Sequence, residues 1–238
     1  MIMFQAVPDE RFILFSFEHM IVLALFLIAF ISGLKIFLRP FSDRSKKIFT
    51  NVFIIIFIVS ELSYQIWAIS AGIWRASNYL PFQLCSFSTF FGIFLLLKRN
   101  TSLFYFYFYI AFFPPLFALI TPDLIYSFPH YFFFKFFIQH IAIPLSAVFL
   151  LARDQYELPK RSIWIAFILL NITAACIALV NRLTGGNYFF LQGPPVSDTA
   201  LSFLGDGVFY IISLELLAVL LFTLTWFIGS KMISLRDR

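Results

Sequence analysis

Cysteine and histidine are the residues of this 238-residue chain best suited to covalent chemistry. Cys85 follows Pro81, which suits the first turn of a helix, and the positive end of the helix dipole would favour a thiolate at Cys85. His140 lies four residues before Pro144, whose missing N–H leaves the His140 carbonyl without its helical donor. A histidine beside such a break should be shielded from lipid. It could be a general base, a proton relay or a hydrogen-bonding strut, and its unperturbed pKa of about 6.5 suits the first two roles.

Other polar side chains interrupt apolar sequence, where an ionisable group costs about 2.5–3.5 kcal/mol at the bilayer centre. Glu61 and Gln65 are four residues apart and share a helix face. The remaining candidates for ligand binding are Gln83, Asp123, Asn187 and Glu215, and His130 is a second candidate base. These groups could instead hydrogen-bond helices to one another. Such bonds are worth about 0.6 kcal/mol each, too little to account for so many.

The elements that carry these residues must be membrane helices. Hydrophobic residues make up 61% of the chain and charged residues 12%, compared with about 45–50% and about 25% in soluble domains. Only helices or a closed barrel satisfy every backbone group in lipid. The apolar runs are continuous over about 20 residues, whereas barrel strands alternate over about 10. The sequence therefore predicts an all-α membrane protein.

Seven apolar runs are long enough to be spans, which predicts one seven-helix transmembrane domain over residues 1–238. The fourth contains Pro114 and Pro115 and should be a kinked span. The predicted spans are 17–38, 48–71, 82–98, 102–120, 131–152, 162–181 and 208–229.

Basic residues predict the orientation because they collect in short cytoplasmic loops. Four of the 17 Lys and Arg residues lie on one side, and the other 13 lie opposite. The four are Arg11, Arg75, Lys135 and Arg182. The N-terminus should therefore be outside and the C-terminus cytoplasmic, in a multi-pass protein of a bacterial inner or plasma membrane. Cytoplasmic loops also account for the net charge of +5, so no nucleic-acid partner is expected, and neither is a metal or a cofactor.

The longest connection is the outer loop 182–207. A loop of this length is often a lid or a binding segment. It could equally be an ordered cap that covers helix ends.

Cys85 and Cys176 should both be buried thiols, since they fall in different apolar runs and an exported disulfide framework does not fit. Cys176 has only apolar and small neighbours in sequence, which favours a structural role. Cys85 could also be no more than a small buried hydrophobe.

Four motifs in order resemble the bacterial YwaF-like family of integral membrane proteins: LPFQLCSFS (80–88), TPDLIYSFPHYFFFKFFIQH (121–140), NRLTGGNYFFL (181–191) and SLELL (213–217). That family is similar, more distantly, to the eukaryotic transmembrane protein 164 group, which is described as a cysteine-dependent phospholipid acyltransferase and compared with lipid hydrolases. The resemblance implies a reactive role for Cys85 and for His130 and His140.

Two functions fit these residues. In the first, Cys85 attacks a membrane-lipid ester and His140, or else His130, takes the thiol proton. Asp123, Glu61 or Glu215 would then orient the imidazole. In the second, the protein is a proton-coupled carrier or a receptor for a small polar solute or lipid head group. Either function predicts that Cys85, His140, Glu61 and Glu215 line one outward-facing cavity.

Overall fold

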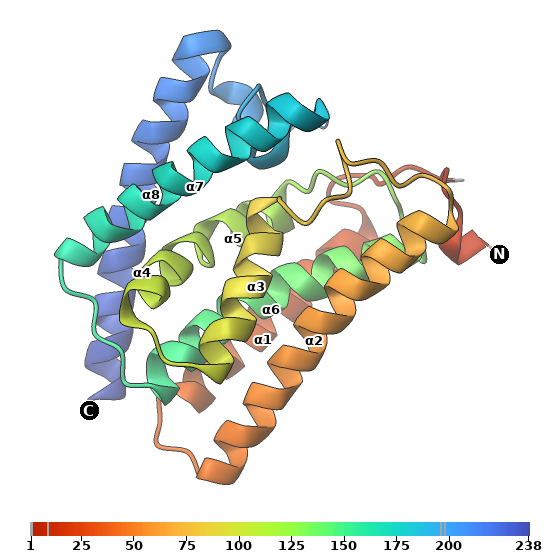
Figure 1. Cartoon of the computed structure of the whole chain (residues 1–238). Coiled ribbons are helices and arrows are strands. Elements are labelled where there is room, and N and C mark those ends of the chain that lie inside the picture. The colour runs from red at the N-terminus through yellow and green to blue at the C-terminus, as the bar shows by residue number, and fades with distance from the viewer. Residues whose placement is uncertain (1, 9, 196, 198) are drawn as a thin grey trace.

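The computed structural model describes residues 2–8, 10–195, 197 and 199–238, and the named elements in this part of the chain are all helices (Figure 1). The α-helices are α1 (Phe17–Phe37), α2 (Asp43–Ser70), α3 (Leu84–Leu97), α4 (Thr101–Ile110), α5 (Phe113–Ile120), α6 (Tyr131–Arg153), α7 (Arg161–Thr184) and α8 (Gly207–Arg236). Three short 3-10 helices are η1 (Ile2–Phe4), η2 (Tyr188–Phe190) and η3 (Ala200–Phe203). The all-α expectation is confirmed.

Six helical segments are long and apolar enough to cross a membrane. They are α1, α2, α4 with α5, α6, α7 and α8. The predicted third span is the apolar helix α3, but it has only 14 residues. At 1.5 Å per residue it reaches about 21 Å, less than the core of a typical bilayer. The fourth span is broken, as expected: α4 ends at Ile110 and α5 begins at Phe113, just before Pro114.

Helix α6 is the centre of the bundle. Of its most apolar 18 residues 72% are buried, compared with 11% in each of α1, α7 and α8. It packs against α1, α2, α3, α5 and, less extensively, α4 and α8. The helix runs from Tyr131 to Arg153 in one piece although Pro144 lies inside it. The polar side chains of Gln139, His140 and Ser146 on α6 are therefore held among neighbouring helices.

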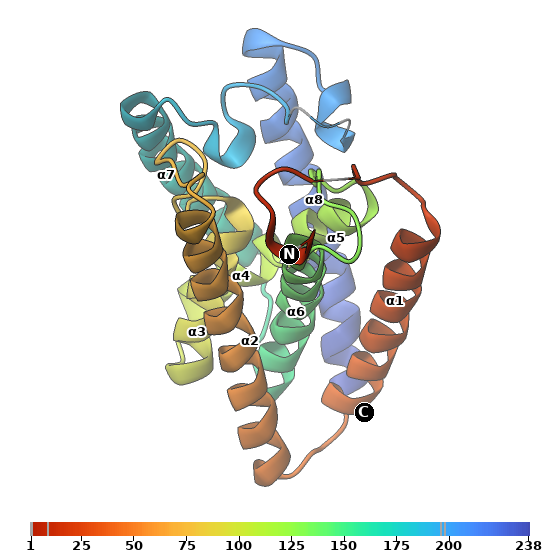
Figure 2. The same ribbon diagram turned by 90° about the vertical axis from the view of Figure 1, so that its right-hand side faces the viewer.

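The helices alternate in direction, which gives the bundle two different ends (Figure 2). The cap end carries the N-terminal segment and the connections 71–83, 121–130 and 185–206. The basic end carries the connections 38–42, 98–100 and 154–160 together with the C-terminus (Figure 1).

Small residues let the helices approach closely. A Cβ at Gly92 on α3 would lie 2.8 Å from the Phe57 ring of α2 and 3.0 Å from the Tyr107 hydroxyl of α4. That hydroxyl also bonds Ser146 Oγ of α6 at 2.6 Å. Gly92 thus permits α3 to pack closely against α2 and α4.

Arg153 fastens the basic end. Its guanidinium donates to Thr50 Oγ1 on α2 at 3.0 Å and to the carbonyls of Leu95 and Leu96 at the end of α3 at 3.0 and 2.9 Å. It also pairs with Asp154 at 2.7 Å. One side chain therefore satisfies the carbonyls that a helix end leaves open and joins three helices.

We expect Arg153→Ala to lower the free energy of unfolding by about 2–4 kcal/mol, because it leaves Asp154 and two carbonyls without their charged donor. Thermal unfolding in detergent measures the loss. Lys47→Ala is the matched control, since Lys47 is exposed and makes no ion pair within the described ranges. Equal melting temperatures for the two variants would contradict the role of Arg153 in joining the three helices.

Candidate functional site

Three buried polar side chains meet where α2, α3 and α6 pack together. Gln139 Nε2 on α6 donates to Glu61 Oε1 on α2 at 2.6 Å and to Thr89 Oγ1 on α3 at 2.8 Å. Their exposed fractions are 6% for Glu61, 1% for Gln139 and 0% for Thr89. We call these three residues the polar junction. Its burial in an otherwise aromatic core makes the polar junction the leading candidate for a functional site.

Cys85 lies directly beside the polar junction. Thr89 Oγ1 donates to the Cys85 carbonyl at 3.0 Å, one turn earlier in α3. The cysteine is half-buried and packs against the hydrophobic core. Pro81 lies before the helix, because α3 begins at Leu84 with Gln83 as its N-cap. The role expected for Pro81 is therefore wrong, but Cys85 is the second helical residue, where the dipole effect is strongest.

Lys135 is the functional candidate that the sequence reasoning missed. Its ammonium lies 4.3 Å from the centre of the Tyr64 ring and 5.7 Å from that of Phe132. It is close enough to act electrostatically on Glu61, Cys85 and His140. Counting it only as an outer basic residue hid the signal, which is its spacing of four residues from Gln139 on the same face of α6.

One oxygen of the Glu61 carboxylate has no partner. Oε1 is held by Gln139, whereas Oε2 is fully buried and accepts no hydrogen bond from the described residues. Lys135 lies more than an ion-pair distance away and over the Tyr64 ring instead. A buried polar atom of this kind carries a desolvation cost with nothing to offset it.

His140 is buried, with 7% of its surface exposed, so the expectation that it is shielded from lipid is confirmed. Its Nδ1 lies 2.7 Å from the Phe136 carbonyl, and its ring stacks on the Phe136 ring at 4.1 Å. That geometry assigns the proton to Nδ1 and leaves Nε2 as an acceptor. No hydrogen bond joins His140 to Cys85 in the described part of the chain.

His130 is committed to the backbone. Nε2 donates to the Gln5 carbonyl at 3.0 Å, and Nδ1 caps α6 by accepting from the Phe132 N–H at 3.0 Å. The ring also stacks on Tyr126 at 4.2 Å. Burial lowers the pKa of His130 below its ordinary value, with partial opposition from the Gln5 carbonyl. These contacts describe a structural histidine that fastens the N-terminal segment.

Gln65, Gln83 and Asn187 hold the cap end in place. Gln65 donates to the Tyr79 carbonyl at 2.7 Å and accepts from Trp74 at 2.8 Å. Gln83 accepts from the Phe189 N–H, and Asn187 bonds residues 192 and 193 within its own loop. The buried Tyr188 donates to the Ala76 carbonyl at 2.7 Å. This part of loop 182–207 is therefore an ordered cap over residues 76–83.

The other predicted residues lie apart from the polar junction. Asp123 is exposed. Glu215 on α8 accepts from Asn171 on α7 at 3.2 Å, so the structure pairs it with α7 and not with Glu61. Cys176 is exposed on α7, and the expectation that it is buried is wrong because that face of α7 is turned away from the bundle.

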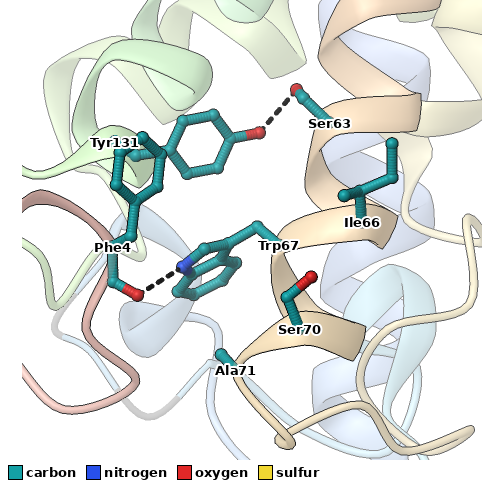
Figure 3. A pocket seen from close by; sticks show the side chains of 7 residues that line it. All are labelled: Phe4, Ser63, Ile66, Trp67, Ser70, Ala71 and Tyr131. Carbon is teal, nitrogen blue, oxygen red and sulfur yellow. Dashed lines mark hydrogen bonds between the residues drawn. The ribbon is translucent and has the colours of Figure 1, made fainter.

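A cavity of about 450 Å³ opens at the cap end, between α2, α6 and the N-terminal segment (Figure 3). The Trp67 indole donates to the Phe4 carbonyl at 3.1 Å, and the Tyr131 hydroxyl donates to Ser63 Oγ at 2.5 Å. Trp67 also stacks on Tyr64, the ring under Lys135, with centres 6.2 Å apart. Tyr64 thus lies between the Trp67 wall of the cavity and Lys135, while Glu61, Gln139 and Thr89 do not line the cavity.

The fold and site define a polytopic helical membrane protein with a cysteine beside a buried polar junction. The model of the TMEM164 family matches residues 14–226. The chain belongs to this family, which confirms the resemblance to the transmembrane protein 164 group. No curated protein and no solved structure matches the chain.

Acid should destabilise the cap end through His130. Because its pKa is lower in the folded state, the unfolded chain takes up the proton at higher pH, near its ordinary value of 6.5. The stabilisation that neutral His130 gives the folded state is complete above pH 6.5 and is lost as the pH falls below it. A proton on Nδ1 then breaks the hydrogen bond that this atom accepts from the Phe132 N–H.

We expect the melting temperature of the wild type to fall more between pH 7.5 and 5.0 than that of His130→Asn, which keeps a capping side chain but cannot titrate. Thermal unfolding across this range gives the comparison. The same acid-induced shift in both proteins would show that other groups cause it.

Proposed function

We propose that this protein is a thiol-dependent acyltransferase or hydrolase that acts on membrane phospholipids, with Cys85 as the nucleophile. The observation that carries the proposal is the position of Cys85 in the first turn of α3, one turn from the polar junction. Partial positive charge at the start of a helix favours the thiolate form, which is the nucleophile. The substrates would be lipids of the membrane that the apolar helices are long enough to cross. Membership of the TMEM164 family agrees with the proposal.

In the first half-reaction the Cys85 thiolate forms a bond to the ester carbon, and the carbon–oxygen bond of the lipid alcohol breaks. His140 is the proposed base. Its Nε2 is the free acceptor nitrogen, so it would take the thiol proton and return it to the departing alkoxide. Lys135 would stabilise negative charge on the tetrahedral intermediate.

The alternative function is a proton-coupled carrier or receptor for a small polar solute or lipid head group. The free Glu61 oxygen and the Lys135 ammonium over the Tyr64 ring favour it, since intramembrane ionisable groups are also typical of transport. Such a protein would depend on Glu61, Glu215 and His140 and would tolerate loss of the thiol.

We expect Cys85→Ala to reduce release or transfer of a labelled acyl chain, measured in phospholipid vesicles, by at least about 10³-fold. Cys176→Ala should keep wild-type activity, because Cys176 is exposed on a distant face of α7. His140→Ala should lose about 10²–10⁴-fold, the usual contribution of a general base. Full activity in Cys85→Ala would exclude the thiol mechanism and leave the carrier.

We further infer that the cap end is extracytoplasmic and the basic end cytoplasmic in the cell membrane. The basic residues of the connections at 38–42, 98–100 and 154–160 support this orientation.

A reporter that is active only in the cytoplasm should therefore be active when fused after Arg238 and inactive when inserted at Gly72, in the connection at the cap end. Cell fluorescence or enzyme activity gives the result. The reverse pattern would invert the orientation without changing the chemistry proposed for Cys85.

A further inference from the structure

The first half-reaction leaves Glu61 Oε2 without a role. This atom lies in a side chain that is 6% exposed, and nothing in the described residues donates to it. A buried oxygen without a donor carries a desolvation cost that a donor on a ligand would offset. The groups around Glu61 determine which donor fits Oε2.

The surroundings of Glu61 fit a hydroxyl group. Oε2 requires a donor, whereas the Lys135 ammonium, which lies over the Tyr64 ring, is itself a donor. A hydroxyl can donate to the first and accept from the second. A hydrocarbon chain could do neither, and an ammonium ligand would be repelled by Lys135.

We propose that Glu61 is a catalytic base for the second half-reaction, in which it takes the proton of the acceptor hydroxyl that removes the acyl group from Cys85. This inference rests on the proposed function. The acceptor is a lysophospholipid hydroxyl or water, which share this chemistry. The hydroxyl oxygen forms a bond to the acyl carbon, the carbon–sulfur bond breaks, and its electron pair stays on Cys85. Glu61 then returns the proton to the thiolate.

The polar junction explains why Glu61 is available for this step. Gln139 fixes Oε1 at 2.6 Å and turns Oε2 away from its own amide, and Thr89 ties Gln139 to the turn that carries Cys85. Gln139 and Thr89 are positioning residues. Trp67 of the cavity at the cap end stacks on Tyr64, the ring beneath Lys135.

The test separates acylation of Cys85 from release of the acyl group. Purified protein is reconstituted in phosphatidylcholine vesicles with a labelled acyl chain, with and without added lysophospholipid. Mass spectrometry reports acyl-Cys85, and lipid analysis reports transfer product and free fatty acid. Wild type, Glu61→Gln, Glu61→Asp and the exposed-carboxylate control Glu10→Gln are compared.

We expect Glu61→Gln to form acyl-Cys85 but to release it about 10²–10⁴-fold more slowly. Hydroxylamine, a nucleophile that needs no base, should clear the trapped acyl group. Glu61→Asp keeps a carboxylate but moves it, so it should slow release less than Glu61→Gln and leave acylation of Cys85 unchanged, which decides the matter if Glu61→Gln does not fold. Slower formation of the diacyl product assigns a lysophospholipid acceptor, and slower formation of fatty acid assigns water.

Release at the wild-type rate in Glu61→Gln would overturn the role of Glu61 while leaving Cys85 as the nucleophile. If Glu61→Gln does not fold, a Glu61→Asp variant that slows the formation and the release of acyl-Cys85 by the same factor would overturn it, because a base for release acts on release alone. Absence of acyl-Cys85 from both the wild type and folded Glu61→Gln would overturn the proposed function and this role together.

Discussion

The amide of Gln139 is the interaction on which the centre of this protein depends. It joins α6 to α2 through Glu61 and to α3 through Thr89, inside a core where water cannot replace a lost bond. Measured hydrogen bonds between membrane helices are individually weak, about 0.6 kcal/mol on average. The Gln139 interaction matters mainly for geometry. It sets the relative position of the Glu61 carboxylate, the Lys135 cation and the Cys85 thiol, which come from three helices.

Both ends of the bundle support that position. At the basic end, Arg153 bonds the last carbonyls of α3, and at the cap end Gln83 and Tyr188 hold the connection that leads into α3. Helix α3 is too short to be fixed by the bilayer alone, with 14 residues. Its anchoring at both ends keeps the first turn, and therefore Cys85, in register with α6.

Much of the architecture could be predicted because lipid imposes a strong constraint on sequence. Continuous apolar runs identified the helices, and Pro114 and Pro115 marked the break between α4 and α5. The residue pairings could not be predicted. Glu215 accepts a hydrogen bond from Asn171 and forms none with the polar junction. Lys135 lies close enough to Glu61 and Cys85 to act on them electrostatically, although its charge had indicated only the side of the membrane on which it lies. Which face of a helix meets which neighbour depends on packing, and no single-residue pattern encodes it.

The central claim is that Cys85 carries an acyl group during turnover. The most direct measurement is the intact mass of protein purified from native membrane, before and after neutral hydroxylamine. The account predicts a fraction of molecules with an added fatty-acyl mass that hydroxylamine removes and that Cys85→Ala lacks. A protein of unmodified mass, even when turnover is stopped rapidly in lipid vesicles, would contradict it.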